Sequence, residues 1–311
     1  METTGKTVNE LPSWNNGEAK TRILNFVKNA TDSASKSYIP PAERIAVFDN
    51  DGTLWNEAPM LFQLNFTFDR IKNLAPQHPE WKTQQPFKAI LENDRETMKK
   101  FSHKELGLLL AASHTGISPE EFKAAATQWF DTAQHPVYKR LYTKCVYQPQ
   151  LELLNYLREN GFKNYIVSGG GVDFMRAFAE KTYGIPPEQI IGTSSKTKLE
   201  TKAGKAVLEK TPELQSFDDR AEKVSNINLH IGRRPVLACG NSDGDLNMLQ
   251  YTAGSATPNL VILIHHDDSE REMAYEKHPV MGELKEGLTE AKARNWILVS
   301  MKNDWKKVFP E

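Results

Sequence analysis

The chain has 311 residues, of which 39% are hydrophobic, 25% charged and 9% aromatic, a composition typical of a folded globular protein. Thirty-nine Lys and Arg against 40 Asp and Glu residues leave a formal net charge of −1, so the sequence lacks the basic field expected of a nucleic-acid-binding protein. Its apolar stretches fall short of the roughly 20 residues that span a bilayer. We therefore expect neither a nucleic-acid nor a membrane partner.

Two cysteines, Cys145 and Cys239, are too few for a disulfide framework, and Cys239 lies in an apolar run typical of a buried strand. The start of the chain has no apolar core and no small-residue cleavage site, unlike a signal peptide. We therefore expect a cytoplasmic protein as the sequence is written, and a periplasmic one if a leader has been removed. The sequence gives no indication of oligomeric state.

In chain order, apolar residues at helical spacing first predict an amphipathic helix at residues 18–29. The pair Pro40-Pro41 excludes a helix there, and residues 45–48 form a short apolar strand that stops at Asp-Asn-Asp-Gly-Thr. Residues 58–148 then show helical periodicity with proline-containing breaks. The sequence Ser-Pro-Glu-Glu at residues 118–121 is typical of a helix start. We therefore predict a helical insertion after the first strand.

The second half of the chain alternates helices with short apolar strands. Strands are predicted at residues 165–167, 190–191, 236–239, 260–264 and 296–299, of which the last lies at a sheet edge. Helices are predicted at residues 151–159 and 172–181. Residues 198–210 are predicted to form a hairpin of two short strands that turns at Ala203-Gly204. This order is typical of an α/β protein with a parallel sheet. We predict a Rossmann-like core of residues 1–57 and 149–311, and a smaller helical cap domain of residues 58–148.

Three of the predicted strands end in polar clusters, at residues 49–53, 168–171 and 240–245. In an open α/β sheet, ligands bind beyond the carboxyl ends of the strands, so we expect the three clusters to meet at one site. Asp49 and Asp51 would repel each other there unless a cation or a shared proton relieves them. Mg²⁺ is the cofactor that this pair favours, because it binds carboxylate, water and phosphate oxygens. An Asx turn with glycine at the bend is the structural alternative.

The first cluster, Asp-Asn-Asp-Gly-Thr-Leu from residue 49, resembles the DxDGT signature of the haloacid dehalogenase superfamily, most of whose members transfer phosphoryl groups through an aspartyl-phosphate. The resemblance implies that Asp49 is the nucleophile and Asp51 the general acid/base. This chemistry is reasonable, because a carboxylate can carry a phosphoryl group while a neighbouring acid protonates the leaving alkoxide and then activates water.

Ser168, at the end of a predicted strand, resembles the second motif of the superfamily, which is a Ser or Thr in that place. Together with the backbone N–H groups of Gly169 and Gly170 it would bind phosphate oxygens. A dinucleotide-binding turn is a competing interpretation, but Phe174 stands where that turn needs its third glycine. A plain glycine turn before a helix is the structural alternative.

Lys223, just before a predicted short helix, is our candidate for the lysine of the third motif, which neutralises the nucleophile and the phosphoryl group. Lys205 has similar neighbours but belongs to the predicted hairpin. Residues 240–245 have the spacing of the fourth motif, GDxxxD, with Asn241 in place of the acid that commonly binds the metal. The metal ligands that the resemblance implies are Asp49, Asp51, Asn241 and Asp245; which of Asn241, Asp243 and Asp245 contacts the metal stays open.

The resemblance extends from about residue 45 to residue 249, and the helical insertion resembles the cap of phosphoserine phosphatases and their relatives. Such a cap closes over the site and excludes water. Glu57 is placed much as the acid that meets the substrate amine in those phosphatases, so we predict that it binds substrate. Four cap residues could line the pocket, although their helical spacing is more typical of a core: Met60, Phe62, Phe66 and Phe68.

Residues 265–268, His-His-Asp-Asp, form a further polar cluster at a strand end. Adjacent side chains rarely bind one ion together, and no partner motif is present elsewhere. We therefore favour a solvated turn over a second metal site or a loop that lines the substrate crevice.

These observations predict a Mg²⁺-dependent phosphatase that hydrolyses a small-molecule phosphomonoester. A metal-independent dehalogenase is disfavoured by Asp51, because the dehalogenases of the superfamily lack an acid there. A phospho-ligand-binding protein without turnover is favoured by Asn241 alone. A phosphomutase or kinase-like transferase is less well supported, and would reveal itself by transfer to an acceptor other than water.

Overall fold

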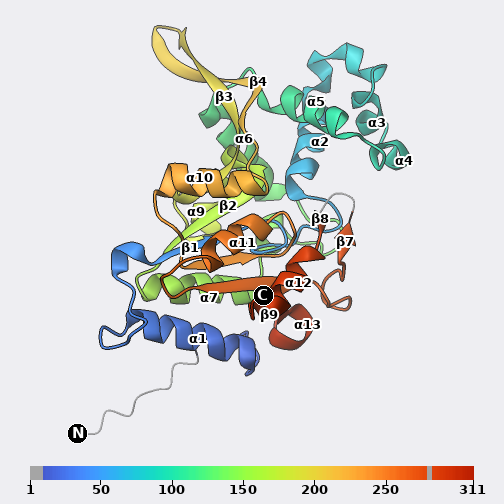
Figure 1. Ribbon diagram of the computed structural model, residues 1–311. Coiled ribbons are helices and arrows are strands. Elements are labelled where there is room, and N and C mark those ends of the chain that lie inside the picture. Colours follow the sequence, from blue (N-terminus) through green and yellow to red (C-terminus); the bar gives the residue numbers. More distant parts are fainter. Residues whose placement is uncertain (1–9, 279–281) are drawn as a thin grey trace, which may run out of the picture.

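The computed structural model describes residues 10–278 and 282–311, and a seven-stranded sheet forms its centre (Figure 1). The strands lie in the order β4 (Lys205–Ser216), β3 (Ile190–Lys202), β2 (Lys163–Gly171), β1 (Ile45–Phe48), β5 (Leu237–Gly240), β6 (Leu260–His265) and β9 (Ile297–Ser300). All neighbours are parallel except β3 and β4, which form an antiparallel hairpin at one edge. The predicted α/β class and the edge position of the last strand are confirmed.

Helices cover both faces of the sheet, which is why its central strands are apolar throughout. Along β1, Ala46 and Phe48 belong to one core cluster, and Ile45 and Val47 to the other. The first cluster includes residues of α1 (Glu18–Thr31) and α7 (Gln148–Glu159), and the second those of α10 (Ala221–Ile231), α11 (Leu246–Ala253) and α12 (Glu286–Ala293). The alternation of side chains along the strand thus builds two cores at once.

The carboxyl ends of β1, β2, β5 and β6 reach the same edge of the sheet because these strands are parallel. The three polar clusters of the sequence therefore converge there, as expected. A separate pair, β7 (Lys277–His278) and β8 (Gly282–Glu283), also lies in the C-terminal part of the chain, and α13 (Met301–Asp304) follows β9.

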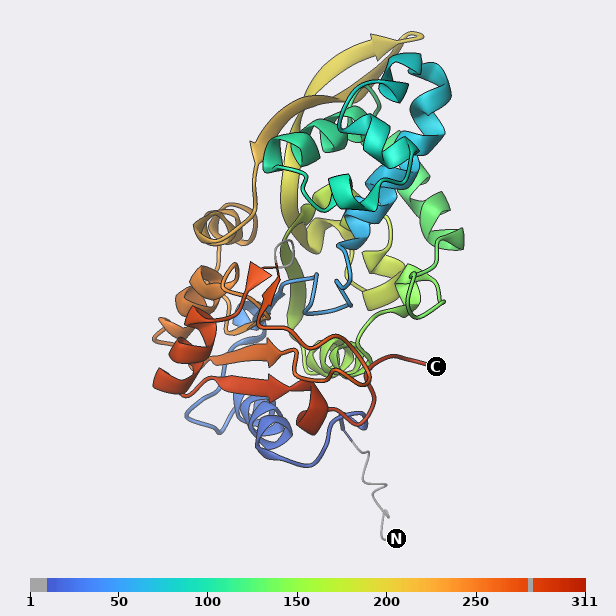
Figure 2. The same ribbon diagram turned by 90° about the vertical axis from the view of Figure 1, so that its right-hand side faces the viewer.

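The insertion after β1 is helical, as predicted, and extends away from the sheet beside the β3–β4 hairpin (Figures 1 and 2). It comprises α2 (Phe62–Leu74), α3 (Phe87–Leu91), α4 (Arg95–Met98), α5 (His103–His114) and α6 (Pro119–Thr132). Ser118 caps α6 in a capping box with Glu121, as its sequence predicted, and Ser102 caps α5 in the same way with Glu105.

The insertion has two parts that pack differently. Phe62 and Phe66 in α2 belong, with Phe122 and Phe130 of α6, to the same core cluster as α1 and the sheet. From Phe68 onward the chain forms a smaller cluster of its own, which comprises Phe68, Ile71, Ala75, Trp81, Phe87, Ile90 and Leu109. The core interpretation of the phenylalanines at 62, 66 and 68 is confirmed, and Met60 packs partly buried against the smaller cluster.

Backbone hydrogen bonds join the hairpin to the insertion. The N–H of Lys210 donates to the carbonyl of Ile117, and the N–H of Gly116 donates to the carbonyl of Lys210. The side chain of Lys210 is buried and forms an ion pair with Asp173 in α8 (Val172–Arg176). The hairpin, the insertion and α8 are therefore connected to one another.

Two predicted elements differ from the structure. The single helix predicted for residues 172–181 is divided into α8 and α9 (Ala179–Tyr183), because Phe178 between them is buried and stacks on Trp55 with ring centroids 4.3 Å apart. The strand at 190–191 continues without a break to residue 202, so the hairpin is longer than predicted. The polar residues in this longer part of β3 show no apolar pattern that would predict a strand. The strand is defined there by its pairing with β4. Within the described residues, no helix is long and apolar enough to cross a membrane.

Candidate active site

Three residues that the sequence singled out form a buried ion-pair cluster. Lys223, in the first turn of α10, donates from Nζ to Asp49 Oδ1 at 2.8 Å and to Asp245 Oδ1 at 2.6 Å. All three side chains are at most 9% exposed. Lys205, the alternative lysine, lies exposed at the tip of the hairpin. The structure therefore brings together the candidate nucleophile, the candidate lysine and the last residue of the fourth motif.

The electrostatics of this cluster follow from its burial. Burial, together with the charge of Asp245, raises the pKa of Asp49 to about 7, although Lys223 opposes the shift. Burial disfavours the charge of Lys223, but the two carboxylates outweigh it and hold the pKa of the lysine above its usual value. Lys223 is therefore a fixed positive charge beside Asp49.

Both carboxylate oxygens of Asp245 are occupied by the protein. Oδ1 accepts from Lys223, and Oδ2 accepts the backbone N–H groups of Asn241 and Ser242, each at 3.0 Å. A Cβ at Gly240 would lie 2.6 Å from the Cβ of Asp245, so only glycine fits at that position. Asp245 therefore orients Lys223 and the loop after β5, and its role as a metal ligand stays a prediction.

Asp51 and Ser168 both lie near Gly170, in the glycine-rich end of β2, which continues as a strand to Gly171 where the sequence predicted a glycine turn. A Cβ placed on Gly170 would lie 3.4 Å from Asp51 Oδ2 and 3.5 Å from Ser168 Oγ. Asp51 Oδ1 accepts from the indole N–H of Trp55 at 2.8 Å, and burial raises the pKa of Asp51. The N–H of Gly170 donates to Ser168 Oγ at 3.2 Å. A carboxyl group whose pKa is raised by burial thus lies near the serine hydroxyl.

Gln63 is a site residue that the sequence did not reveal. Its Oε1 accepts the N–H of Gly171 at 2.8 Å and lies 3.8 Å from the same Cβ position on Gly170. Its Nε2 is 3.1 Å from Nε2 of His114, whose pKa is lowered to about 3 by burial and by the charges of Lys210 and Arg70. The neutral imidazole accepts from Gln63, so the glutamine is oriented from the insertion toward Asp51. A lone glutamine in the first turn of an apolar helix was the one local signal.

Glu57 and Asn241 form a second buried pair. Asn241 Nδ2 donates to Glu57 Oε1 at 3.1 Å, and Asn241 Oδ1 accepts from the hydroxyl of Thr53 at 3.0 Å. Tyr275 also donates its hydroxyl to Glu57 Oε1. Burial raises the pKa of Glu57 well above its usual range; Tyr275 opposes this shift, and the charges of Asp51 and Asp49 add to it. The side chain predicted to meet substrate is only 2% exposed and contacts protein groups.

The solvated turn predicted for residues 265–268 is wrong for two of its residues. His266 is buried, with Nε2 2.8 Å from the carbonyl oxygen of Gly52 and Nδ1 3.1 Å from Glu272 Oε2. Asp268 is also buried and pairs with Arg271. The segment after β6 folds back over the loop that carries Asp51, a long-range contact without a local signal. Across residues 10–278 and 282–311, no group of three or more His, Cys, Asp or Glu side chains could hold a metal ion, which leaves the second-metal-site alternative without support.

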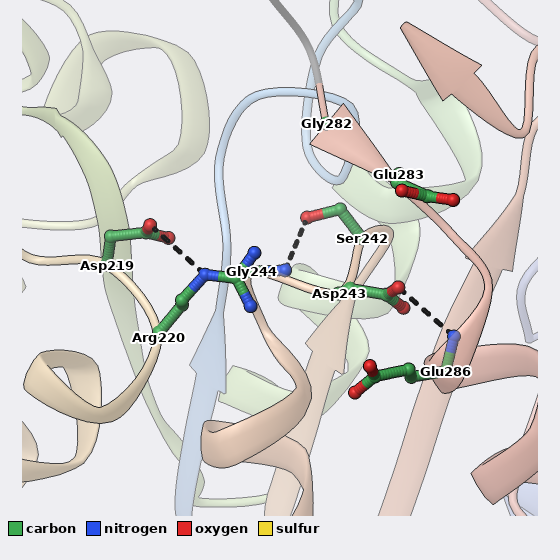
Figure 3. Close-up of a pocket in the computed structure, with 8 residues that line it drawn as sticks. All are labelled: Asp219, Arg220, Ser242, Asp243, Gly244, Gly282, Glu283 and Glu286. Atoms are coloured by element: carbon green, nitrogen blue, oxygen red, sulfur yellow. Dashed lines mark hydrogen bonds and ion pairs between the residues drawn. The ribbon is translucent and has the colours of Figure 1, made fainter.

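Asp243 anchors the start of α12. Its carboxylate accepts the N–H groups of Glu286 at 3.1 Å and Gly287 at 2.8 Å. Asp243 lies in a pocket of about 310 Å³ beside the α10 loop, where Figure 3 shows its bond to Glu286, that of Ser242 to Gly244 and the contact of Arg220 with Asp219. The pocket lining is Asp219, Arg220, Ser242, Asp243, Gly244, Gly282, Glu283 and Glu286.

The chemistry of the donors fits a magnesium ion at the end of β1. Asp49, Asp51 and Asn241 offer hard carboxylate and amide oxygens, and Mg²⁺ needs few protein ligands in addition to water and phosphate. Asp51 and Glu57 are held by neutral donors, and the one lysine is shared by Asp49 and Asp245. A divalent cation bound here would favour the ionised forms of Asp51 and Glu57, whose pKa values burial raises.

The comparisons with known proteins agree with this geometry. The sequence model of the family described as haloacid dehalogenase-like hydrolase matches residues 46–250, about two thirds of the chain. The chain belongs to the haloacid dehalogenase-like hydrolases, which confirms the superfamily that the DxDGT motif indicated. A comparison with curated protein sequences found no match.

Three solved structures are similar to this chain to different extents. A conserved protein of unknown function from Anaerococcus prevotii DSM 20548 is 16% identical, with 92% of this chain and 94% of that one covered and a TM-score of 0.57. A protein of unknown function from Bordetella pertussis Tohama I is 17% identical, with 83% and 98% covered and a TM-score of 0.48. A phosphoserine phosphohydrolase-like protein from Francisella tularensis is 18% identical, with 72% and 88% covered and a TM-score of 0.40. The first likeness concerns the fold alone, and the other two, with TM-scores below 0.5, carry no argument.

Proposed function

We propose that the protein is a Mg²⁺-dependent phosphatase that hydrolyses a small-molecule phosphomonoester through an aspartyl-phosphate on Asp49. The observation that carries this proposal is the contact of Lys223 with Asp49, beside Asp51 and Ser168 at one edge of the sheet. Oxygen ligands from Asp49, Asp51 and Asn241 would hold Mg²⁺, which would supply positive charge against the phosphoryl oxygens.

The first half of the reaction uses the two aspartates in different states. Lys223 binds Asp49 Oδ1, so Oδ2 is the oxygen that attacks phosphorus. As the new bond forms, the bond from phosphorus to the ester oxygen breaks, and the proton of Asp51 moves to the departing alkoxide. Ser168 and Lys223 stabilise the charge on the phosphoryl oxygens. The raised pKa of Asp51 suits this role because it keeps a proton available.

The second half reverses the role of Asp51. Its carboxylate takes a proton from a water molecule, which attacks the phosphorus of the acyl phosphate, and the bond to Asp49 breaks to release phosphate. Residues 58–148 act as the cap that keeps bulk water away from the intermediate, with Gln63 contacting the site from that side. A substrate amine at Glu57 was the expectation from sequence; in this structure Glu57 is bonded to Asn241 and Tyr275 and only 2% exposed.

Phosphate release from p-nitrophenyl phosphate tests the proposal, with Mg²⁺ or with EDTA, in the wild-type protein and in Asp49→Asn. We expect turnover to require both the metal and Asp49, and to fall to background when either is removed. Glu283→Gln, on the pocket beside the site, is the matched carboxylate-to-amide control and should retain activity. Activity that survives EDTA or Asp49→Asn would overturn the metal or the nucleophile assignment. Transfer of the phosphoryl group to an added alcohol instead of water would indicate a transferase.

A further inference from the structure

The loop from Asp51 to Trp55 is closed by two hydrogen bonds, one from the backbone and one from a side chain. The N–H of Gly52 donates to the carbonyl of Trp55 at 2.9 Å, and the indole N–H of Trp55 donates to Asp51 Oδ1 at 2.8 Å. Trp55 has no exposed surface, whereas Asp51 is partly exposed. The indole can only donate, and a carboxyl oxygen accepts in either protonation state, so the bond holds one oxygen of Asp51 throughout.

The other oxygen of Asp51 faces the segment proposed to bind phosphate. A Cβ built on Gly170 would lie 3.4 Å from Asp51 Oδ2 and 3.5 Å from Ser168 Oγ. If the Asp51 side chain turned away from Gly170, the bond from the indole would break. The indole therefore restricts Asp51 to the orientation in which Oδ2 lies beside the glycines.

The indole is itself fixed by aromatic rings from two parts of the chain. Phe178, between α8 and α9, stacks on it with ring centroids 4.3 Å apart and planes 14° apart. Phe62 in α2 and Phe130 in α6 place their ring centroids 4.6 and 6.2 Å from that of the indole. Close packing of this kind resists rotation of the indole. The insertion and the core therefore hold together the group that orients Asp51.

A second indole-to-aspartate bond in the chain provides a comparison. Trp129 in α6 donates its indole N–H to Asp69 Oδ2 at 2.9 Å, which links two helices of the insertion. A buried or half-buried indole usually finds such an acceptor, so the bond alone has a structural explanation. The bond of Trp55 differs because its acceptor is the candidate acid/base, and because the second oxygen of that acceptor faces the site.

We propose that Trp55 is a positioning residue for Asp51: its indole fixes Oδ1, so that Oδ2 is the oxygen that exchanges protons with the ester and with water. This inference rests on the proposed function, in which Asp51 is the general acid/base. The proton on Oδ2 passes to the departing alkoxide as the bond from phosphorus to the ester oxygen breaks. A proton from the attacking water then returns to Oδ2. Trp55 keeps its own N–H in both steps.

The test compares two esters of similar shape that differ in their need for an acid. Nitrophenolate leaves phosphorus without a proton more readily than phenolate does, so a misplaced acid slows phenyl phosphate more than p-nitrophenyl phosphate. We expect Trp55→Phe, assayed with Mg²⁺, to lower kcat/KM for phenyl phosphate by roughly tenfold or more and for p-nitrophenyl phosphate by about twofold or less. The ratio kcat/KM is the right measure because it ends with formation of the aspartyl-phosphate and excludes its hydrolysis.

Trp129→Phe is the matched control, because it removes an indole-to-aspartate bond that lies within the insertion. It should leave the ratio of the two kcat/KM values at that of wild type. Equal losses for the two esters in Trp55→Phe, or wild-type values for both, would overturn the inference, because a structural role affects both esters alike. A wild-type protein that hydrolyses p-nitrophenyl phosphate but not phenyl phosphate has no acid for Trp55 to position, and also overturns it.

If Trp55→Phe does not fold, replacement of Trp55 by 3-benzothienylalanine decides, because this residue keeps the shape of the indole and lacks its N–H. A selective loss on phenyl phosphate then supports the inference, and an unchanged ratio or an unfolded protein overturns it. Absence of Mg²⁺-dependent phosphate release from either ester in the wild-type protein would overturn the proposed function and the inference with it. Failure of the inference alone leaves that release intact.

Discussion

Asp245 and Glu57 are both buried carboxylates of the site, and they are held in opposite ways. Asp245 has a lysine on one oxygen and two backbone N–H groups on the other, so its charge is balanced within the chain. Glu57 accepts from the amide of Asn241 and the hydroxyl of Tyr275, and forms no ion pair with a residue of the described part of the chain. The difference teaches that a lysine can fix the geometry of a buried acid, whereas an acid held by neutral donors has its pKa raised by burial.

The largest expected effect comes from removing the lysine on the balanced side. Lys223→Met leaves Asp49 and Asp245 facing each other without a cation, which should lower the free energy of unfolding by about 3–5 kcal/mol and phosphate release by on the order of 10³-fold. Urea unfolding and a phosphate assay measure the two effects. Lys205→Met, at the exposed hairpin tip, is the control and should change neither.

Gly52→Ala would disrupt the pair of Glu57 and Asn241 by steric crowding. Its new methyl group would meet Asn241 and Glu57, and we expect Mn²⁺ affinity, measured by titration, to fall by roughly tenfold or more, an effect of about 1.4 kcal/mol. Gly204→Ala is the matched control, because Gly204 has a similar φ of +76° and no neighbouring atoms within 4 Å. It bears the backbone strain of about 1–2 kcal/mol without the crowding. Equal metal affinity in the two variants would contradict the contact.

His114→Gln tests whether the imidazole that contacts Gln63 stays neutral at acidic pH. The histidine has a pKa of about 6.5 in the unfolded chain and about 3 when folded, so below pH 6.5 the unfolded state binds a proton that the folded state refuses. Its contribution to the free energy of unfolding should therefore fall by up to about 1.4 kcal/mol per pH unit between pH 6.5 and 3. The variant should lose less stability than wild type between pH 6.5 and 5.

The smallest effect concerns Gln63. Gln63→Leu removes the amide that contacts Gly171, and we expect kcat to fall about tenfold, or about 1.4 kcal/mol in transition-state stabilisation. Mn²⁺ affinity should stay unchanged, because no metal ligand contacts the amide. Steady-state kinetics beside the metal titration separate the two. Gln84→Leu, on the same insertion but away from Gly171, is the control. A loss of metal affinity equal to that of Gly52→Ala would show that the two contacts are not independent.

The sequence was sufficient for the features whose signal is local. The buried strand before Asp49, the capped helix at Ser118 and the motifs around Ser168 and Asn241 each lie within a few residues, and each appears where it was predicted. Lys223 could be predicted because it precedes the fourth motif by about one helix and one strand, which is the spacing expected of the third-motif lysine. The geometry of the ion-pair cluster then followed from the parallel sheet.

The contacts that could not be predicted join residues far apart in the chain. Gln63 meets Gly171 across 108 residues, and His266 meets Gly52 across 214. Neither residue has neighbours that distinguish it from an ordinary polar side chain at the end of a helix or strand. Burial decides their role, and burial depends on how the segment after β6 and the insertion fold over the sheet.

The two-part packing of the insertion has a consequence for exchanging substrate-recognition modules between related enzymes. Cutting the chain at residues 58 and 148 would remove Phe62, Phe66, Phe122 and Phe130 from the same core that holds the sheet. The segment from Phe68 to Ala112 contains the smaller cluster and is the natural unit to transplant. The recombination boundary therefore falls inside α2, between Phe66 and Phe68, which belong to different core clusters, and not in the loops where a domain boundary would be sought.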